Sequence, residues 1–299
     1  MTHTPRLYVP AITPFGPDLS VDTARFVASC RRILADGADG LAVFGTTSEA
    51  NSMSVAERIA ALDALVDAGI DPARLIPGTG CAALPDTVAL TRHATALGCK
   101  GVLMLPPFYY KPLSDDAVFA SYAAVIDAVP DVALYLYHIP QIAGVALSIP
   151  MIARLIEAFP GTVRGLKDSS GKWDNTAAVI AAFPGIETFS SSESLLPQNV
   201  AAGGAGCISA SANVNAAGIM RLIRALGTAE EAASLAQVSA VRTACEGMPL
   251  IPGVKAVAAI RMADPNYARV RPPLVPLTQD QTAQAARAAS LCLWQEPVS

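Results

Sequence analysis

Short apolar runs alternate with longer amphipathic runs along most of the chain. The short runs, of four to six residues, predict buried strands, at Leu7–Ala11, Gly40–Phe44, Leu75–Gly78, Gly101–Leu105, Val132–Tyr137, Val163–Lys167, Glu187–Ser190 and Cys207–Ala210. The longer runs predict helices. Ser54–Ala68, for example, has the 3.6-residue apolar period and opens on Ser54 and Glu57, the pattern of a capping box. Eight strands that alternate with helices predict an α/β protein with a (β/α)8 TIM barrel.

The strand pattern stops at about residue 226, which predicts two parts. Residues 1–226 would form the catalytic barrel, and 227–299 a C-terminal helical extension. Three helices are expected in the extension, at Thr228–Glu246, Ile251–Met262 and Thr278–Trp294. A doubly wound open sheet is the alternative, but the dinucleotide-binding G-x-G-x-x-G does not follow the first strand.

Composition narrows the class of protein. Of the 299 residues, 52% are hydrophobic and 15% charged, and the mean hydropathy is +0.41. No uninterrupted apolar stretch approaches the roughly 18 residues of a membrane span, so we assign the apolar excess to the core and to subunit interfaces. The N-terminal segment lacks the basic and apolar regions of a signal peptide, so we expect a cytoplasmic protein. A net charge of −4 and the absence of a basic stripe argue against nucleic acid as a partner.

The cysteines and histidines do not suggest a metal site. The six cysteines are scattered and contain no C-x-x-C, and the three histidines are far apart. Buried thiols are therefore expected in place of disulfides, and no zinc site is expected.

Lys167 stands where the sixth predicted strand ends. Functional groups of such barrels gather at the C-terminal ends of the strands. Burial disfavours a charged ammonium, and the neutral amine is a nucleophile. An ion pair with Asp168 or another carboxylate is an equally reasonable interpretation from position alone.

Two neighbouring features favour lysine chemistry. Tyr137 ends the adjacent strand, and strands lie roughly 4.8 Å apart, so its phenol could exchange protons with a group bound to Lys167. Thr46 and Thr47 follow a glycine in a turn whose hydroxyl and N–H groups suit a carboxylate. Alone, the tyrosine would more often be a packing residue and the threonines simple turn residues.

Four motifs, in order along the chain, resemble those of the dihydrodipicolinate synthase/N-acetylneuraminate lyase family of class I Schiff-base aldolases. The family's G-T-T-G-E, Y-N-x-P, G-x-K-D-x-[ST] and G-G-x-G-x-I-S are similar to Gly45–Glu49, Tyr137–Pro140, Gly165–Ser170 and Gly203–Ser209. Ser48 replaces a glycine, so its φ must be one that a serine tolerates.

The resemblance implies roles for individual residues. Lys167 would be the Schiff-base nucleophile and Tyr137 the general acid and base. Thr46 and Thr47 would hold the substrate carboxylate, with Thr47 also in a proton relay to Tyr137. Tyr109 would reach a neighbouring subunit's site in a homodimer or homotetramer, with Tyr110 as a rival for that role. Other substrate-binding candidates are Ile208, through its carbonyl, and Ser191, Glu193, Ser209 and His138.

The departures from the family's motifs bear on the substrate. Dihydrodipicolinate synthases place an arginine where this chain has Ile142, and an apolar side chain cannot bind a second carboxylate. Neuraminate lyases have an Asp-Glu pair where this chain has Ser192 and Glu193. His138 replaces an asparagine and would either orient its loop or contact substrate.

The resemblance therefore implies a carbon–carbon lyase that makes or uses pyruvate, without a cofactor. A 4-hydroxy-2-oxo acid of the 2-keto-3-deoxy sugar acid type is the expected substrate. The alternatives are 4-hydroxy-tetrahydrodipicolinate synthase, a sugar-acid dehydratase, and a non-catalytic protein that binds a 2-oxo acid.

Overall fold

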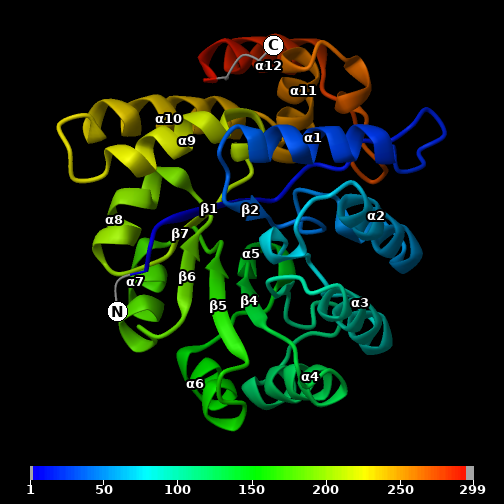
Figure 1. Ribbon diagram of the computed structural model, residues 1–299, viewed down its shortest axis with the longest axis vertical. Helices are drawn as coiled ribbons and strands as arrows, with labels where there is room; N and C mark the ends of the chain where they lie inside the picture. Colours follow the sequence, from blue (N-terminus) through cyan, green and yellow to red (C-terminus); the bar gives the residue numbers. More distant parts are fainter. Residues whose placement is uncertain (1–2, 294–299) are drawn as a thin grey trace. The chain divides into compact units, whose positions relative to one another are not determined.

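The computed structural model describes residues 3–293 and divides the chain into two compact units. The first consists of Asp71–Cys207 with the short segment before Arg6, and the second of Arg6–Ile70 with the chain from Ile208 onward. Strands and helices alternate in the α/β manner that the sequence predicts (Figure 1).

The first unit contains five strands that pair in parallel in the order of the chain. They are β3 (Val102–Met104), β4 (Leu134–His138), β5 (Val163–Asp168), β6 (Glu187–Ser190) and β7 (Gly206–Ile208). The helices of this unit are α3 (Leu84–Ala96), α4 (Asp115–Ala128), α5 (Pro140–Ala143), α6 (Ile149–Ala158), α7 (Trp173–Ala182) and α8 (Leu196–Ala201). In Figure 1, α6 and α7 flank β5 and β6.

The ring of Tyr135 in β4 fits beside β5 and β3 because glycines lie next to it. A Cβ atom at Gly165 would come within 2.6 Å of the Tyr135 ring, and one at Gly101 within 2.8 Å. Glycine in β5 and glycine immediately before β3 therefore leave room for this buried ring, whose hydroxyl donates to Glu187 at 2.6 Å. The register that follows pairs Tyr137 with Lys167.

The third expected strand, Leu75–Gly78, forms only a parallel bridge between Gly78 and Leu103. Leu103 N–H donates to Pro77 and Thr79 N–H donates to Leu103, at 2.9 and 3.1 Å. Pro77 has no N–H group to continue the ladder. The segment thus lies beside β3 as predicted but is too short to count as a strand.

The second unit contains β1 (Arg6–Val9) and β2 (Gly40–Leu41), which pair in parallel. Strand β2 is shorter than predicted and ends at Leu41, and the expected end, Phe44, has a left-handed φ of 58° that a strand does not continue through. The helices are α1 (Thr23–Ala35), α2 (Val55–Asp67), α9 (Ala212–Ala225), α10 (Glu231–Glu246), α11 (Leu250–Arg261) and α12 (Gln279–Leu291). The capping box of Ser54 and Glu57 at the start of α2 is present as predicted.

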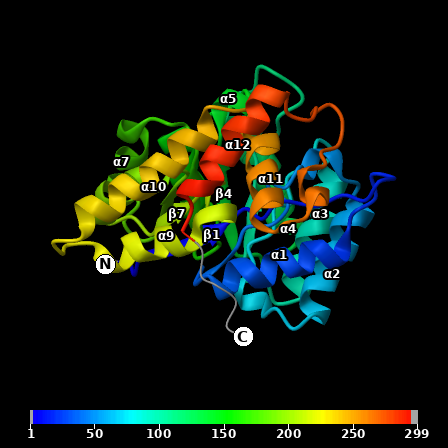
Figure 2. The same ribbon diagram turned by 90° about the horizontal axis from the view of Figure 1, so that it is seen from above.

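The three expected C-terminal helices are confirmed as α10, α11 and α12, although Trp294 lies outside the described residues. Figure 2 shows α11 beside α12, and apolar residues of α9–α12 form one buried cluster that includes Val241, Val257 and Ala285. The separation of a helical extension at residue 227 stays a prediction.

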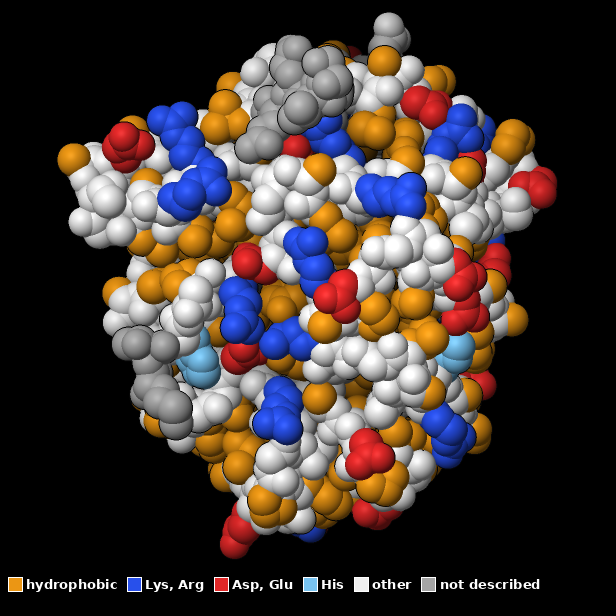
Figure 3. Space-filling view, viewed as in Figure 1, with side chains coloured by type: hydrophobic (Ala, Val, Ile, Leu, Met, Phe, Trp, Pro, Cys, Tyr) orange, Lys and Arg blue, Asp and Glu red, His pale blue; other side chains and the backbone are white. Residues whose placement is uncertain are grey.

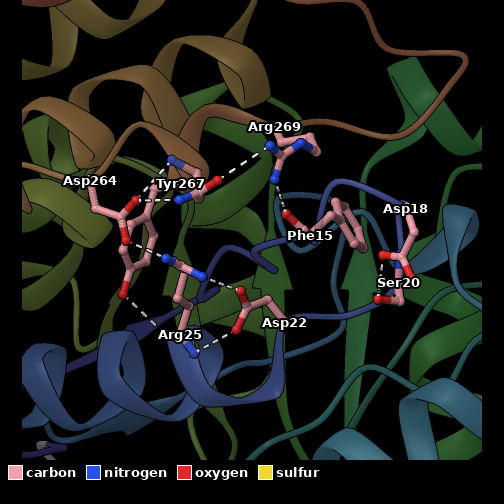
Figure 4. Close-up of polar contacts among 9 residues, drawn as sticks. Phe15, Asp18, Ser20, Asp22, Arg25, Asp264, Tyr267 and Arg269 are labelled. Atoms are coloured by element: carbon pink, nitrogen blue, oxygen red, sulfur yellow. Dashed lines mark hydrogen bonds and ion pairs between the residues drawn. The ribbon is translucent and has the colours of Figure 1, made fainter.

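Polar contacts join the start of the second unit to its C-terminal part (Figure 4). The Arg25 guanidinium bonds Asp22 and Asp264, and the Tyr267 hydroxyl donates to the Arg25 carbonyl. Arg269 donates to the Phe15 carbonyl at 2.6 Å. These contacts attach the segment after α11 to α1 and to the turn after β1.

Three further features bear on the sequence interpretation. All six cysteines are free thiols, as expected. Within residues 3–293, no helix is both long and apolar enough to cross a membrane. On the face drawn in Figure 3, basic and acidic side chains lie among one another.

Candidate active site

Lys167 is a buried lysine near the C-terminal end of β5. Only 4% of the residue is exposed. The strand spans Val163–Asp168 without a turn, so it carries Lys167 to this end. Successive side chains of a strand point to opposite faces. Lys167 and Asp168 therefore belong to different faces of β5.

The neighbour of the Lys167 amine is Tyr137 on β4. The two residues are register partners, and Nζ lies 3.4 Å from the phenol oxygen and 4.4 Å from the ring centroid. Tyr137 is also buried, with 3% exposed. The structure thus brings together the predicted nucleophile and the predicted acid–base group, as their adjacent strands led us to expect.

Asp168 is not the ion-pair partner of Lys167. Its carboxylate accepts hydrogen bonds from Ser170 N–H at 2.8 Å, from the Asn175 amide at 3.0 Å and from the Thr176 hydroxyl at 2.6 Å. These donors belong to the turn after β5 and to α7. Asp168 therefore fixes this turn, and among residues 3–293 no carboxylate forms an ion pair with the Lys167 amine.

His138 follows Tyr137 and lies on the opposite face of β4, in register with Asp168. Its Nδ1 accepts the Leu147 N–H at 3.0 Å. Burial lowers the pKa of His138, and the negative charge of Asp168 opposes this only in part. Two roles were expected for His138, to orient its loop or to contact substrate. The hydrogen bond to Leu147 favours the first, and the second stays a prediction.

Hydrogen bonds within the second unit hold the loop that carries Thr46 and Thr47. The Ser48 hydroxyl donates to the Ala11 carbonyl at 2.6 Å, and the Thr13 hydroxyl donates to the Ser48 carbonyl at 2.7 Å. The left-handed residue of the loop is Glu49, with φ 57°, and Ser48 has no positive φ. Serine is thus tolerated where the family has glycine. The roles of the two threonines toward Lys167 stay predictions.

Glu49 forms a fully buried ion pair that the sequence analysis missed. Lys255 Nζ of α11 donates to Glu49 Oε1 at 2.5 Å and to the Thr13 carbonyl at 2.8 Å, and neither charged side chain is exposed. Arg271 N–H donates to the other carboxylate oxygen at 3.0 Å. Burial lowers the pKa of Lys255 to about 8, although Glu49 acts to raise it. A single lysine in the otherwise apolar run Leu250–Ile260 was the available signal.

The remaining predicted site residues are divided between the two units. In the first unit Glu193 is buried, Ser191 is half-buried, and Tyr109 and Tyr110 are 71% and 76% exposed. In the second, Ile208 and Ser209 are buried, and the Ser209 hydroxyl lies 3.0 Å from the Ser211 hydroxyl and accepts from Arg242 at 3.1 Å. Their substrate-binding roles stay predictions. Across residues 3–293, His, Cys, Asp and Glu nowhere gather in groups of three or more that could hold a metal.

Comparison with known proteins places these residues in a family. The model of the dihydrodipicolinate synthetase family matches residues 3–291. An uncharacterized DapA-like lyase of Chloroflexus aurantiacus is 38% identical over 285 residues, which cover 93% of each chain. A 4-hydroxy-tetrahydrodipicolinate synthase of Synechococcus sp. is 29% identical over 95% of this chain and 93% of its own.

A solved structure shows the same fold. Dihydrodipicolinate synthase from Agrobacterium tumefaciens superposes with a TM-score of 0.88 at 31% identity, covering 96% of this chain and 99% of its own. The predicted (β/α)8 barrel class with C-terminal helices is thereby confirmed. The chain belongs to the dihydrodipicolinate synthetase family and is a lyase of the aldolase type.

Proposed function

We propose that this protein is a class I aldolase that forms a Schiff base between Lys167 and pyruvate or a pyruvate-yielding 2-oxo acid. The observation that carries the proposal is the buried Lys167 amine beside the Tyr137 hydroxyl, at 3.4 Å. The amine has no carboxylate partner among the described residues, so no ion pair holds it in the charged form.

The proposed reaction begins with attack of the neutral amine on the C2 carbonyl of a 4-hydroxy-2-oxo acid. Tyr137 protonates the resulting alkoxide, and loss of water from the carbinolamine gives the iminium ion. The C3–C4 bond then breaks, and its electron pair moves into the iminium ion while Tyr137 accepts the proton of the C4 hydroxyl. An aldehyde leaves. Protonation of the enamine at C3 and hydrolysis of the imine return pyruvate and the free lysine.

The contrast with Lys255 supports the choice of Lys167. Both lysines are buried, but Lys255 is committed to the Glu49 carboxylate and the Thr13 carbonyl. A nucleophilic amine needs a free lone pair, and the Glu49 carboxylate favours the charged form of Lys255. Within the described part of the chain, the Lys167 amine makes one long hydrogen bond, to a group that can take up and return a proton.

Ile142 supports the choice of substrate class. By the resemblance to the family's motif, this residue stands where dihydrodipicolinate synthases have an arginine for a second carboxylate, and the residue is 60% exposed. An isoleucine offers no charge-assisted hydrogen bond. We therefore favour a 2-keto-3-deoxy sugar acid, whose tail beyond C4 carries hydroxyl groups. The names of relatives such as the Synechococcus protein favour the second candidate, condensation of pyruvate with aspartate semialdehyde.

Borohydride reduction in the presence of pyruvate tests the Schiff base. We expect mass spectrometry to find a reduced pyruvate adduct on the peptide that contains Lys167, and none in Lys167→Ala. The matched control is Lys100→Ala, which removes a lysine that lies 3.7 Å from Glu187 and should leave the adduct unchanged. An absent adduct on Lys167, or a persistent one in Lys167→Ala, would overturn the proposal.

The substrate is tested separately. A panel of 2-keto-3-deoxy sugar acids should release pyruvate, whereas a dehydratase would yield a dehydrated acid with its carbon skeleton intact. Efficient turnover of pyruvate with aspartate semialdehyde would contradict the inference from Ile142. It would leave the Schiff base on Lys167 in place.

A further inference from the structure

A pocket lies beside His138, whose side chain is on the opposite face of β4 from Tyr137. It has a volume of about 560 Å³ and is lined by His138, Gln141, Leu147, Ser170, Lys172 and Asn175, among others. These residues come from the end of β4, the segment before α6 and the turn after β5. Neither Lys167 nor Tyr137 lines it. The pocket is thus separate from the site at which the Schiff base is proposed.

His138 supplies an unused hydrogen-bond donor to this pocket. The residue is 4% exposed, and its Nδ1 accepts the Leu147 N–H, which requires the neutral ring to carry its proton on Nε2. Nε2 makes no hydrogen bond with any of residues 3–293. The Nε2–H group of this pocket residue is therefore available to an acceptor on a bound ligand.

The surrounding groups define the chemistry of that acceptor. Lys172 is exposed at the rim, and its ammonium forms no ion pair within the described part of the chain. The Ser170 hydroxyl accepts Lys172 N–H at 3.2 Å and so keeps its proton for donation. Together with His138, these donors suit a carboxylate.

Two carboxylates that contact residues of the pocket, Asp168 and Asp115, already accept hydrogen bonds from protein donors. Asp168 is bonded by Ser170, Asn175 and Thr176, and Asp115 of α4 accepts the Ser148 hydroxyl at 2.5 Å. The amide groups of Asn175 and Gln141 donate to Asp168 and to the Ser169 carbonyl, which leaves their oxygens as acceptors. Acceptors beside a donor cluster suit a ligand that has hydroxyl groups next to its carboxylate.

We propose that this pocket binds a small hydroxylated carboxylic acid, with its carboxylate on His138 Nε2–H and Lys172. The volume is in the range of small-molecule sites, roughly 300–1,000 Å³. The site is independent of the proposed Schiff base, because its ligand needs no ketone.

Gluconate is a suitable probe because it has a carboxylate and hydroxyl groups but no carbonyl that could react with Lys167. The chain has only three histidines, so His138 can be followed by imidazole NMR and assigned by its loss in His138→Asn. Gluconate should shift the His138 resonances and raise the pKa of His138, because a bound carboxylate stabilises the imidazolium. Sorbitol, which lacks the carboxylate, should do neither.

Two variants test whether gluconate binds in this pocket. Lys172→Ala should weaken the gluconate effect on His138 by roughly tenfold, the cost of one charge-assisted hydrogen bond. Arg92→Ala, which removes an exposed cation from α3 of the same unit, should leave it unchanged. His138 resonances that ignore gluconate, or a Lys172→Ala protein that responds like the wild type, would show that the proposal is wrong. Either result would leave the borohydride experiment on Lys167 unaffected.

Discussion

Tyr137 is the proposed acid–base group, and both its hydroxyl and its ring lie against the Lys167 amine. Tyr137→Phe keeps the ring and removes the hydroxyl. We predict that turnover falls by about 10²–10⁴-fold, the usual contribution of a positioned proton donor. Borohydride should still trap pyruvate on Lys167, but more slowly.

Tyr122→Phe is the matched control for this prediction. It also removes a buried tyrosine hydroxyl, one that donates to the Met104 carbonyl at 3.1 Å. Single-turnover kinetics should show a slow step in Tyr137→Phe alone. Equal rates in wild type and Tyr137→Phe would eliminate Tyr137 as the proton carrier.

The Lys255–Glu49 pair is a second residue-scale feature with a measurable consequence. Lys255→Met leaves the Glu49 carboxylate buried without its cation, which typically costs about 3–5 kcal/mol of unfolding free energy. Urea denaturation measures this loss. The double variant Lys255→Met with Glu49→Gln removes both charges and should regain part of it. If the double variant is no more stable than Lys255→Met, the pair is not the source of the loss.

At the scale of elements, Glu57 joins the start of α2 to the segment after α11. It closes the capping box with Ser54 and forms an ion pair with Arg271. Hydrogen bonding to Arg271 lowers the pKa of Glu57 from 4.5 to about 2. The folded protein therefore binds this proton more weakly than the unfolded chain does. The stabilisation is complete above about pH 4.5 and disappears as the pH falls toward 2.

Glu57→Gln tests this dependence, because glutamine preserves the capping box and removes the charge. We predict that the variant is less stable than wild type near neutral pH, by under about 1 kcal/mol since the carboxylate is partly exposed. The difference should shrink at low pH. Urea denaturation at several pH values would contradict the prediction if the difference stayed constant.

The strands and the Lys167–Tyr137 pair could be predicted because both depend on local pattern. Buried parallel strands are continuous apolar runs, and residues at the ends of neighbouring strands meet. The early end of β2 could not be predicted in this way. Phe44, the expected end, is left-handed, and Ser48 in the loop that follows is held by Thr13 and Ala11, which lie 35 and 37 positions earlier in the chain.

The buried ion pair was missed for a related reason. Lys255 and Glu49 are 206 positions apart, and no periodicity connects them. Only the cost of burying an unpaired charge implies that a lysine in an apolar helix has a partner. That argument requires a partner for Lys255 but does not identify it. Glu49 is identified as the partner only in the folded second unit, where α11 lies against the loop after β2.

At the scale of the whole molecule, Tyr109 and Tyr110 expose large aromatic surfaces. They are 71% and 76% exposed, and their rings meet edge to face at 5.3 Å. Exposed aromatic pairs of this kind are typical of protein interfaces. With the mean hydropathy of +0.41, they lead us to predict a homo-oligomer, either a dimer or a tetramer.

Light scattering after size exclusion tests this prediction, because the solution mass should be a multiple of the 30.8 kDa chain. Tyr109→Ala and Tyr110→Ala, made separately, show which tyrosine is needed: the variant that loses its interface contact should shift toward the monomer mass. Val275→Ala, at a similarly exposed apolar position of the second unit, is the control and should keep the wild-type mass. A wild-type protein that stays at the mass of one chain at every concentration would contradict the prediction, since the exposed tyrosines would then have no neighbouring subunit to contact.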